Sequence, residues 1–336
     1  MEHLYNFSFA FTHLKVCFQQ AIALRHFIET RNISPDHIIF YNYWLYKNVI
    51  TCALHNRVAE TSIPIISRAH SGDLYHSTWY QINAGANITF LPFEHFKVKA
   101  TQRIFCISSH GLHHLQRTFP QYKSKFELAR LGVRKSASIN KILDKGLFQI
   151  VTCSLISANK RIHLMPEILS HLRDLNIIWT HFGWGDDAIV HELKQSIAHH
   201  RVESVCHLRG TVPNAEITRM YETEQVNLLV NLSRAEGIPV SIMEAFSFGV
   251  PAIATSTVGN PEIVDTDSGY LIPVDFSIEH IAQLIRQLAT DEALQQKLRD
   301  GARRKFESHF DAQINYSHFA AELGEICNSR NSGQSM

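Results

Sequence analysis

Several features that would assign this chain to common protein classes are missing from its sequence. No run of apolar residues approaches the roughly 20 needed for a helix that spans a bilayer, so any membrane contact is expected from the surface. The first residues lack a basic segment followed by an apolar one, so we expect no signal peptide. Lysine plus arginine number 32 and aspartate plus glutamate 31, which gives no whole-chain attraction to nucleic acid.

The six cysteines also lack the spacing of a metal or disulfide framework. None belongs to a C-x-x-C pair, and several lie in apolar runs such as 104–107 and 150–153. Such residues are usually buried free thiols in a reducing compartment, so a cytoplasmic protein is expected. The adjacent histidines at 113–114 and 199–200 have no carboxylate or cysteine at ligand spacing. We therefore expect neither a metal site nor a cofactor.

What the sequence does contain is a regular alternation of short apolar runs and longer amphipathic segments. Hydrophobic residues make up 45% and charged residues 19%, as in ordinary globular proteins. Strands that alternate with helices indicate βαβ units and parallel sheets. Strands are expected at 37–41, 64–67, 103–107, 148–152, 177–180, 226–230 and 251–255. Helices are expected at 160–175, 187–199, 213–223, 239–248 and 278–291.

A polar, turn-rich segment after Gly132 interrupts this alternation and predicts a domain boundary. We expect an α/β protein of two Rossmann-like domains that face a cleft. The first domain has only three clear strands, so it is expected to be short and incomplete. The expected parts are a first domain at 1–135, a linker at 136–147, a second domain at 148–310, and a C-terminal helix and tail at 311–336.

The most informative segment runs from Val230 to Pro251. Glu236 lies just before a helix that should begin near Pro239, and Glu244 lies inside that helix. Backbone N–H groups at a helix start have no intrahelical partner, and the helix dipole favours anions there. We therefore expect a phosphate cradle between two carboxylates, a combination that suits a sugar nucleotide. The cradle comprises Gly237, Ile238, Pro239 and Val240. Two glutamates alone would more simply be solvated surface residues.

This segment resembles the E-x7-E region of the retaining glycosyltransferases of family four, glycogen-synthase-like enzymes with the GT-B fold. The resemblance continues through 255–264 and 268–272 and covers most of 148–300. It implies that the second domain binds the donor, with Glu236 on the donor sugar and Glu244 on the ribose. The family usually has two glycines and one more residue before Pro261, whereas this chain has only Gly259 and Asn260.

Three further segments of the second domain extend the resemblance. The segment 154–161 resembles the loop in which the family places an arginine and a lysine on the donor phosphates. Lys160 matches the lysine, while Leu155 stands where the arginine is common, and Arg161 could substitute for it. The segment 181–185 resembles a glycine turn after the next strand. Val212, in 210–214, matches a loop that borders the nucleotide base.

In the first domain, 41–45 and 67–75 resemble a bacterial branch that acts in surface-polysaccharide assembly. His70 follows a strand, at the edge where open α/β sheets bind ligands, and is expected to contact the sugar or the acceptor. The simpler alternative is a loop histidine in a chain with 21 histidines. The segment at Tyr41 comes far earlier than in the family, which predicts an N-terminally shortened acceptor-side domain.

The resemblance implies a metal-independent, retaining hexosyltransferase with Glu236, Lys160 and His70 as catalytic residues. It would move a sugar from a nucleotide-sugar donor to a saccharide or lipid-linked acceptor of lipopolysaccharide, capsule or exopolysaccharide, with peripheral contact to the inner face of the cell membrane. An epimerase or phosphorylase on a similar fold remains an alternative. So does an inactive or weakly active remnant that binds a nucleotide sugar or a partner protein. A nicotinamide dehydrogenase is disfavoured, because no G-x-G-x-x-G follows a strand.

Overall fold

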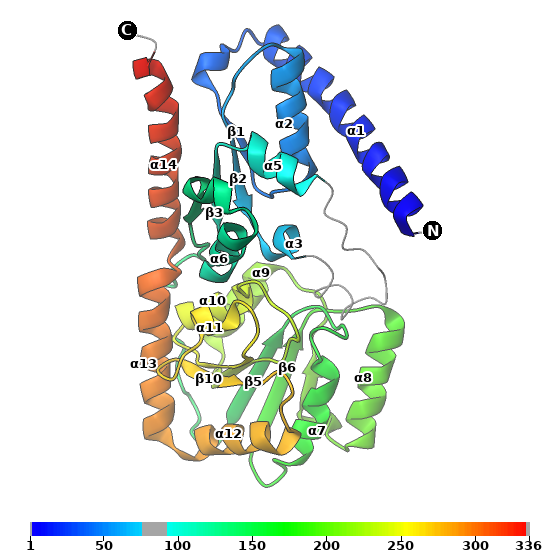
Figure 1. Cartoon of the computed structure of the whole chain (residues 1–336). Helices are drawn as coiled ribbons and strands as arrows, with labels where there is room; N and C mark the ends of the chain where they lie inside the picture. The colour runs from blue at the N-terminus through cyan, green and yellow to red at the C-terminus, as the bar shows by residue number, and fades with distance from the viewer. Residues whose placement is uncertain (1, 76–92, 334–336) are drawn as a thin grey trace. The chain divides into compact units, whose positions relative to one another are not determined.

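The chain forms two compact units in a computed structural model that describes residues 2–75 and 93–333, with side chains at 10–75 and 93–328. The first unit contains the described residues up to Arg130 together with those from Tyr316 onward, and the second contains 131–315. Each unit is built on its own parallel sheet, which confirms the expected α/β class (Figure 1).

The sheet of the first unit has four parallel strands in the order β1-β2-β3-β4. The strands are β1 (Phe40–Asn42), β2 (Ile65–Ala69), β3 (Arg103–Cys106) and β4 (Phe126–Leu128). Three of them were expected. The strand β4 was not expected, because it has three residues, two of them only half-buried, and so leaves too little apolar signal. Every connection between these strands steps in the same direction across the sheet.

Helices cover both faces of this sheet. One face packs on α2 (Lys47–Val58), α5 (Glu94–Ala100) and α6 (Ser109–Thr118), and the other packs on the part of α14 (Ala312–Gly333) that belongs to this unit. Neighbouring strand residues alternate between the faces: Ile65 and Ile104 join the first core, Ile66 and Phe105 the second. The long α1 (Glu2–Thr30) packs along α2, and the four-residue α3 (Ser71–Leu74) follows β2.

The sheet of the second unit has six parallel strands in the order β10-β9-β8-β5-β6-β7. They are β5 (Phe148–Cys153), β6 (Ile177–Phe182), β7 (Cys206–Leu208), β8 (Leu228–Asn231), β9 (Ala252–Thr255) and β10 (Gly269–Ile272). Four were expected, while β7 and β10 were missed. The direction of the connections reverses between β5 and β8. Such a topological switch point opens a crevice outside the carboxyl ends of the two strands, where open α/β sheets bind ligands.

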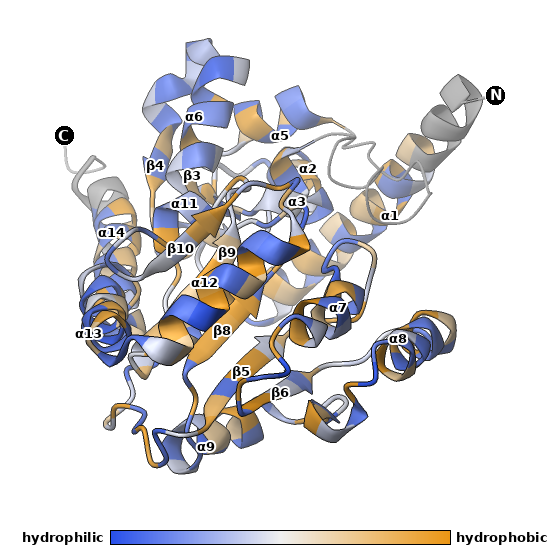
Figure 2. Ribbon diagram, turned by 90° about the horizontal axis from the view of Figure 1, so that it is seen from below, coloured by the Kyte–Doolittle hydropathy of each residue, from blue (hydrophilic) through white to orange (hydrophobic). Residues whose placement is uncertain are grey.

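The helices of the second unit are α7 (Met165–Ser170), α8 (Asp187–His199), α9 (Asn214–Thr223), α10 (Val240–Ser247), α11 (Asn260–Ile263), α12 (Ile278–Thr290) and α13 (Glu292–His309). Among the described residues of the second unit, five helices were expected from the sequence, whereas α11 and α13 were not. The helix expected at 160–175 is shorter, and a 3-10 turn at Ile162–Leu164 precedes it. Figure 2 shows why the strands were predicted to be apolar: β8 is orange and β5 and β6 are orange over part of their length, while α12 shows much blue on the side turned to the viewer.

The segment expected as a linker, 136–147, groups with the second unit. Asn140 is buried there, and its Nδ2 donates hydrogen bonds of 2.7 Å to the backbone oxygens of Tyr221 and Glu224. Arg299 donates from Nη1 to Val226 O at 2.8 Å and from Nη2 to Asn140 O. These buried polar contacts hold the segment against the end of α9 and the residues just before β8.

The six cysteines are free, and Cys17, Cys52 and Cys106 are buried, as expected for structural thiols. Among the described residues, no helix has both the length and the apolar character needed to cross a bilayer.

Candidate functional site

The switch point of the second sheet brings together two residues that the sequence singled out. Lys160 comes from the loop after β5 and Glu236 from the loop after β8, and Lys160 Nζ donates a hydrogen bond to Glu236 Oε1. The two residues lie 76 positions apart in the chain. Only the strand order, which makes β5 and β8 neighbours, puts their loops side by side.

The carboxylate of Glu236 is buried, with 7% of the residue exposed, and it is held from one side. Ser233 Oγ donates to Oε1 at 2.7 Å, and Asn231 Nδ2 donates to the same oxygen at 3.2 Å. All these bonds fall on Oε1, while Oε2 receives none from the part of the chain that the structure describes. The arrangement fixes the carboxylate and leaves one oxygen for a ligand.

Asn159 holds the two loops together, a role that sequence reasoning missed. Its Oδ1 accepts from Ala235 N and its Nδ2 donates to Ala235 O, both at 3.0 Å. Its backbone oxygen accepts from Arg234 N at 2.8 Å. From the next strand, Thr255 Oγ1 donates to Ser233 O at 2.5 Å. The Glu236 loop is therefore fixed before any ligand arrives. In the sequence, the only signal for this role of Asn159 is its position next to Lys160.

The start of α10 supplies backbone amides beside this pair. The N–H groups of Gly237, Ile238, Val240 and Ser241 have no acceptor among the described residues. Pro239, the residue that caps the helix, has no N–H and so contributes no donor. Among the described residues, three of the four residues expected in the cradle, Gly237, Ile238 and Val240, therefore have a free N–H group, and so does Ser241. Helix starts with free N–H groups favour anions, so an anion site here stays a prediction.

Two glycines let these loops approach one another. A Cβ on Gly259 would lie 1.4 Å from the carbonyl oxygen of Gly237, so the loop after β9 can pass there only with glycine. Gly183, at φ 123°, lies in a left-handed region, and a Cβ on it would lie 1.8 Å from Ser154 O. The expected glycine turn after β6 therefore packs directly against the loop that carries Lys160.

Glu244 faces α9 from the middle of α10. Its Oε1 accepts a hydrogen bond of 2.7 Å from Asn214 Nδ2, and burial raises the pKa of its carboxyl group. Val212 is half-buried in the segment that leads into α9. Glu244 also lines a cavity of about 500 Å³. The other polar residues of its lining include Arg134, Lys135, Asn214, Thr218 and Tyr221.

Arg161 occupies a structural position behind Lys160. Its backbone is left-handed (φ 52°), and the buried guanidinium donates to Leu232 O at 2.5 Å and to Val274 O at 2.7 Å. Burial lowers its pKa to about 10, and it lies 4.6 Å from the ring centre of Phe276. Of its nitrogens, only Nη2 has no partner among the described residues. Contact between Arg161 and a phosphate therefore stays a prediction.

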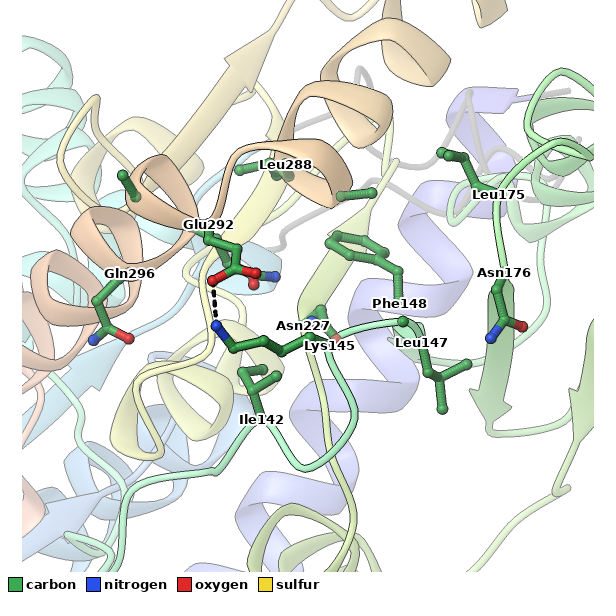
Figure 3. A pocket seen from close by; sticks show the side chains of 14 residues that line it. Ile142, Lys145, Leu147, Phe148, Leu175, Asn176, Asn227, Leu288, Glu292 and Gln296 are labelled. Atoms are coloured by element: carbon green, nitrogen blue, oxygen red, sulfur yellow. Dashed lines mark hydrogen bonds and ion pairs between the residues drawn. The ribbon is translucent and has the colours of Figure 1, made fainter.

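A second cavity of this unit, about 520 Å³, lies at the opposite edge of the sheet (Figure 3). Phe148, Asn176 and Asn227 line it, at the amino ends of β5, β6 and β8. An ion pair of 2.5 Å between Lys145 and Glu292 lies at this cavity. The cavity that Glu244 lines has a similar volume, and neither cavity is lined by Lys160 or Glu236. The carboxyl edge differs because it combines a fixed carboxylate, a lysine and free amides.

His70 lies in the first unit, directly after β2. Only 6% of it is exposed, and its ring centre lies 4.8 Å from that of Tyr43 and 4.1 Å from that of Trp44. Burial lowers the pKa of the imidazole to about 4, so it is neutral at neutral pH. Its Nε2 has no partner among the described residues. Its expected contact with a sugar stays a prediction.

A metal site was not expected from the sequence. Among the described residues, no group of three histidine, cysteine, aspartate or glutamate side chains could hold a metal ion. A reaction that needs no metal stays a prediction, because a donor can bring its own ion.

The residues that carry this site match a known family. Residues 135–305, about half of the chain, match the family described as glycosyl transferases group 1, and the chain belongs to it. One relative is a protein named putative colanic acid biosynthesis glycosyltransferase WcaL from Escherichia coli, 30% identical over 49% of this chain and 42% of its own length. Another is named amylovoran biosynthesis glycosyltransferase AmsK from Erwinia amylovora, 33% identical over 44% of this chain and 37% of its own length.

Solved structures agree on the fold. The crystal structure of Anabaena Alr3699/HepE in complex with UDP has a TM-score of 0.71 at 16% identity, and the match covers 91% of this chain and 82% of that one. The fold is therefore that of the GT-B glycosyltransferases, as the sequence resemblance implied. The matches to the two named relatives span less than half of those proteins' lengths.

Proposed function

We propose that this protein is a retaining glycosyltransferase that moves a sugar from a nucleotide-sugar donor to a saccharide or lipid-linked saccharide in surface-polysaccharide biosynthesis. One observation carries the proposal: the Lys160–Glu236 pair and the free amides of α10 lie together at the switch point of the second sheet. The names of the relatives, colanic acid and amylovoran glycosyltransferases, support the polysaccharide part.

The donor contacts follow from the chemistry of each group. The four free amides and Lys160 would bind the diphosphate, and Lys160 would exchange its partner Glu236 for a phosphate oxygen. The free Oε2 of Glu236 would accept a hydrogen bond from a hydroxyl of the donor sugar. Glu244, oriented by Asn214, would accept one from the ribose. A carboxylate that accepts hydroxyl hydrogen bonds makes a strong, directional contact.

The same groups would promote the reaction. As the bond between the sugar carbon and the diphosphate oxygen breaks, negative charge grows on the leaving phosphate. Lys160 and the amides of Gly237, Ile238, Val240 and Ser241 would stabilise that charge, a contribution that often dominates catalysis. The acceptor hydroxyl would attack on the face from which the diphosphate leaves, so configuration is retained. Its proton would pass to the departing phosphate.

We also propose that the reaction needs no divalent metal and takes place in the cytoplasm, at the membrane surface. The free amides and Lys160 supply the positive potential that a metal gives in other transferases. The six free thiols suit a reducing compartment. For peripheral membrane contact, α1 offers the exposed side chains of Phe11, Phe18 and Ile22 on one side of the helix.

The test is a thermal-shift screen of nucleoside diphosphates and nucleotide sugars, with and without EDTA. A ligand at about 100 times its Kd stabilises the folded state by about 2.7 kcal/mol, which is easily measured. We expect one nucleotide series to stabilise the protein whether or not EDTA is present, and Lys160→Ala to abolish the shift. If no nucleotide acts, or if the shift requires added manganese or magnesium, the proposal is wrong in its donor or its metal part.

A weakly active or inactive protein that binds a nucleotide sugar is a second candidate, and one observation favours it. Among the described residues, the sheet of the first unit has four strands, against six in the second, which suits a shortened acceptor-side domain. If the acceptor side is impaired, donor binding should be normal while transfer to crude lipid-linked oligosaccharides is absent. Turnover at the usual scale of about 1–1000 per second would exclude this candidate.

A further inference from the structure

Four side chains gather at the carboxyl ends of β1 and β2 in the first unit, and the proposed function leaves three of them without a role. Tyr43 and Trp44 follow β1, Arg68 lies in β2, and His70 follows β2. We call these four residues the edge cluster. Ligands of open parallel sheets bind at this edge of the strands.

The edge cluster presents an aromatic surface to solvent. Tyr43 and Trp44 are each 47% exposed, and their ring centres lie 6.0 Å apart. The imidazole of His70 packs against both rings from the buried side, at 4.1 and 4.8 Å. Large aromatic side chains are seldom left half-exposed as a pair without a partner to cover them. The C–H face of a pyranose ring is such a partner, since it stacks on aromatic rings while its hydroxyls bond to polar neighbours.

Arg68 makes the edge cluster unusual. The residue is 1% exposed, and none of its three guanidinium nitrogens has a hydrogen-bond partner among the described residues. It lies over the rings of Phe319, at 4.1 Å, and Tyr316, at 5.4 Å. Such contacts stabilise a cation only partly, and a buried guanidinium normally pairs with an anion. The residues without described side chains include a single carboxylate side chain, Glu2.

The charge of Arg68 acts on the rest of the cluster. Burial lowers the pKa of His70, and the charge of Arg68 lowers it further. Burial raises the pKa of Tyr43, and the same charge offsets part of that rise. The nearest acidic side chain along the chain, Asp73, is already engaged: its Oδ2 accepts from the backbone N–H groups of His70 and Leu45, both at 3.0 Å. Asp73 thus ties the β1 and β2 loops together and fixes the cluster in place, without neutralising Arg68.

We propose that the edge cluster binds a sugar ring bearing a negatively charged substituent, a carboxylate or a phosphate, as part of the acceptor. The inference rests on the proposed function. Trp44 and Tyr43 would stack on the ring, and Arg68 would pair with the charged group. His70 Nε2 would accept a hydrogen bond from a hydroxyl. Because Arg68 and His70 Nε2 are buried, a half-exposed side chain such as Tyr43 must turn aside when the sugar binds.

Three matched probes test the chemistry: methyl β-glucoside, methyl β-glucuronide and methyl β-glucoside 6-phosphate. They share one pyranose ring and differ only at the sixth carbon. Binding to the full chain is measured by NMR titration. We expect a charged probe to bind at least about tenfold more tightly than the glucoside, since a hydrogen-bonded charge pair contributes on that scale. Preference for the glucuronide identifies a uronic acid, and preference for the phosphate a sugar phosphate.

Variants assign the roles of the side chains. Trp44→Ala should weaken the binding of all three probes. Arg68→Met should remove the preference for the charged probes and leave the affinity for the glucoside unchanged. Met fills the aromatic cage of Phe319 and Tyr316 without an unpaired charge, so the variant should stay folded, with an unchanged or higher melting temperature. The control is Phe96→Ala, which truncates another exposed aromatic residue of the same unit and should not change the binding of any probe.

Nucleoside diphosphate binding is measured on the same samples, so that the two proposals can fail separately. If the nucleotide binds but the three probes bind equally or not at all, the inference is wrong and the proposed function stands. If Arg68→Met keeps the preference for the charged probe, Arg68 is not the anion partner and the inference is also wrong. If no nucleotide binds, the proposed function itself fails.

Discussion

Both units consist of a parallel sheet with helices packed on it. They differ in the order of their strands and in how their buried polar groups are hydrogen-bonded. In the second unit the order reverses between β5 and β8, and the polar groups at that point are paired in advance: Lys160 with Glu236, Asn159 with the Glu236 loop. In the first unit the order never reverses, and Arg68 and His70 keep unpaired nitrogens in buried positions. The family match also lies in the second unit. The second unit also has buried unpaired atoms, such as Arg161 Nη2 and His181 Nε2, but only in the first unit is a whole guanidinium group, that of Arg68, without a partner among the described residues.

Removing the lysine should have the largest effect of any single change in the second unit. Lys160→Ala deletes the positive charge expected on the leaving phosphate, so turnover should fall by about 100- to 1000-fold in steady-state transfer or donor-hydrolysis assays. Lys194→Ala, an exposed lysine of the same unit, is the control and should retain activity. A loss of less than tenfold for Lys160→Ala would mean that another group handles the phosphate charge.

Substitutions of the two glutamates should affect the binding of different ligands. Glu244→Ala should weaken the binding of a nucleoside diphosphate and of its sugar conjugate equally, by about 10- to 100-fold, because both ligands contain the ribose. Glu236→Ala should weaken the sugar conjugate far more than the nucleoside diphosphate, because only the conjugate carries the sugar. Calorimetric titration of both ligands measures the difference. Identical losses for both ligands in both variants would contradict these roles.

A pair of glycine substitutions compares the packing of the two units. Gly259→Ala places a methyl group against Gly237 O, so the Glu236 loop must shift, at a cost of about 1–3 kcal/mol in the free energy of unfolding, with loss of donor binding. Gly324→Ala, in α14, meets nothing within 4 Å and should be neutral or stabilising by up to about 1 kcal/mol. Denaturant unfolding measures both. A neutral Gly259→Ala would show that the loops do not touch.

Each unit also buries a neutral histidine of strongly lowered pKa, and near neutral pH the effect on stability expected from these is the smallest. Burial lowers the pKa of His70 and of His181 to about 4. Because an unfolded chain protonates histidine near pH 6.5, each contributes stability that is complete above about that pH and is lost as the pH falls toward 4. NMR titration of the imidazole signals should show no protonation at about pH 6. A midpoint near 6.5 for either ring would contradict its burial.

The second unit was more predictable from the sequence than the first, for a physical reason. Its strands are apolar on both faces, so β5, β6, β8 and β9 and the helices between them were expected within a few residues. The close pairing of Lys160 with Glu236 could not be derived from spacing, since it depends on the strand order. Three-residue strands such as β4 and β7 carry too few side chains for a pattern. Neither Arg68 nor Asn159 was noticed, because a side chain's unpaired or bridging state exists only in three dimensions.

The most direct test of the central claim is hydrogen–deuterium exchange of the full chain, with and without the nucleoside diphosphate that the thermal-shift screen selects. We expect the nucleotide to protect backbone amides at 154–161 and 232–241, the two loops at the carboxyl edge of the second sheet. Protection at the opposite edge instead, around 142–148 and 292–296, or in the first unit alone, would contradict the placement of the donor site at the switch point.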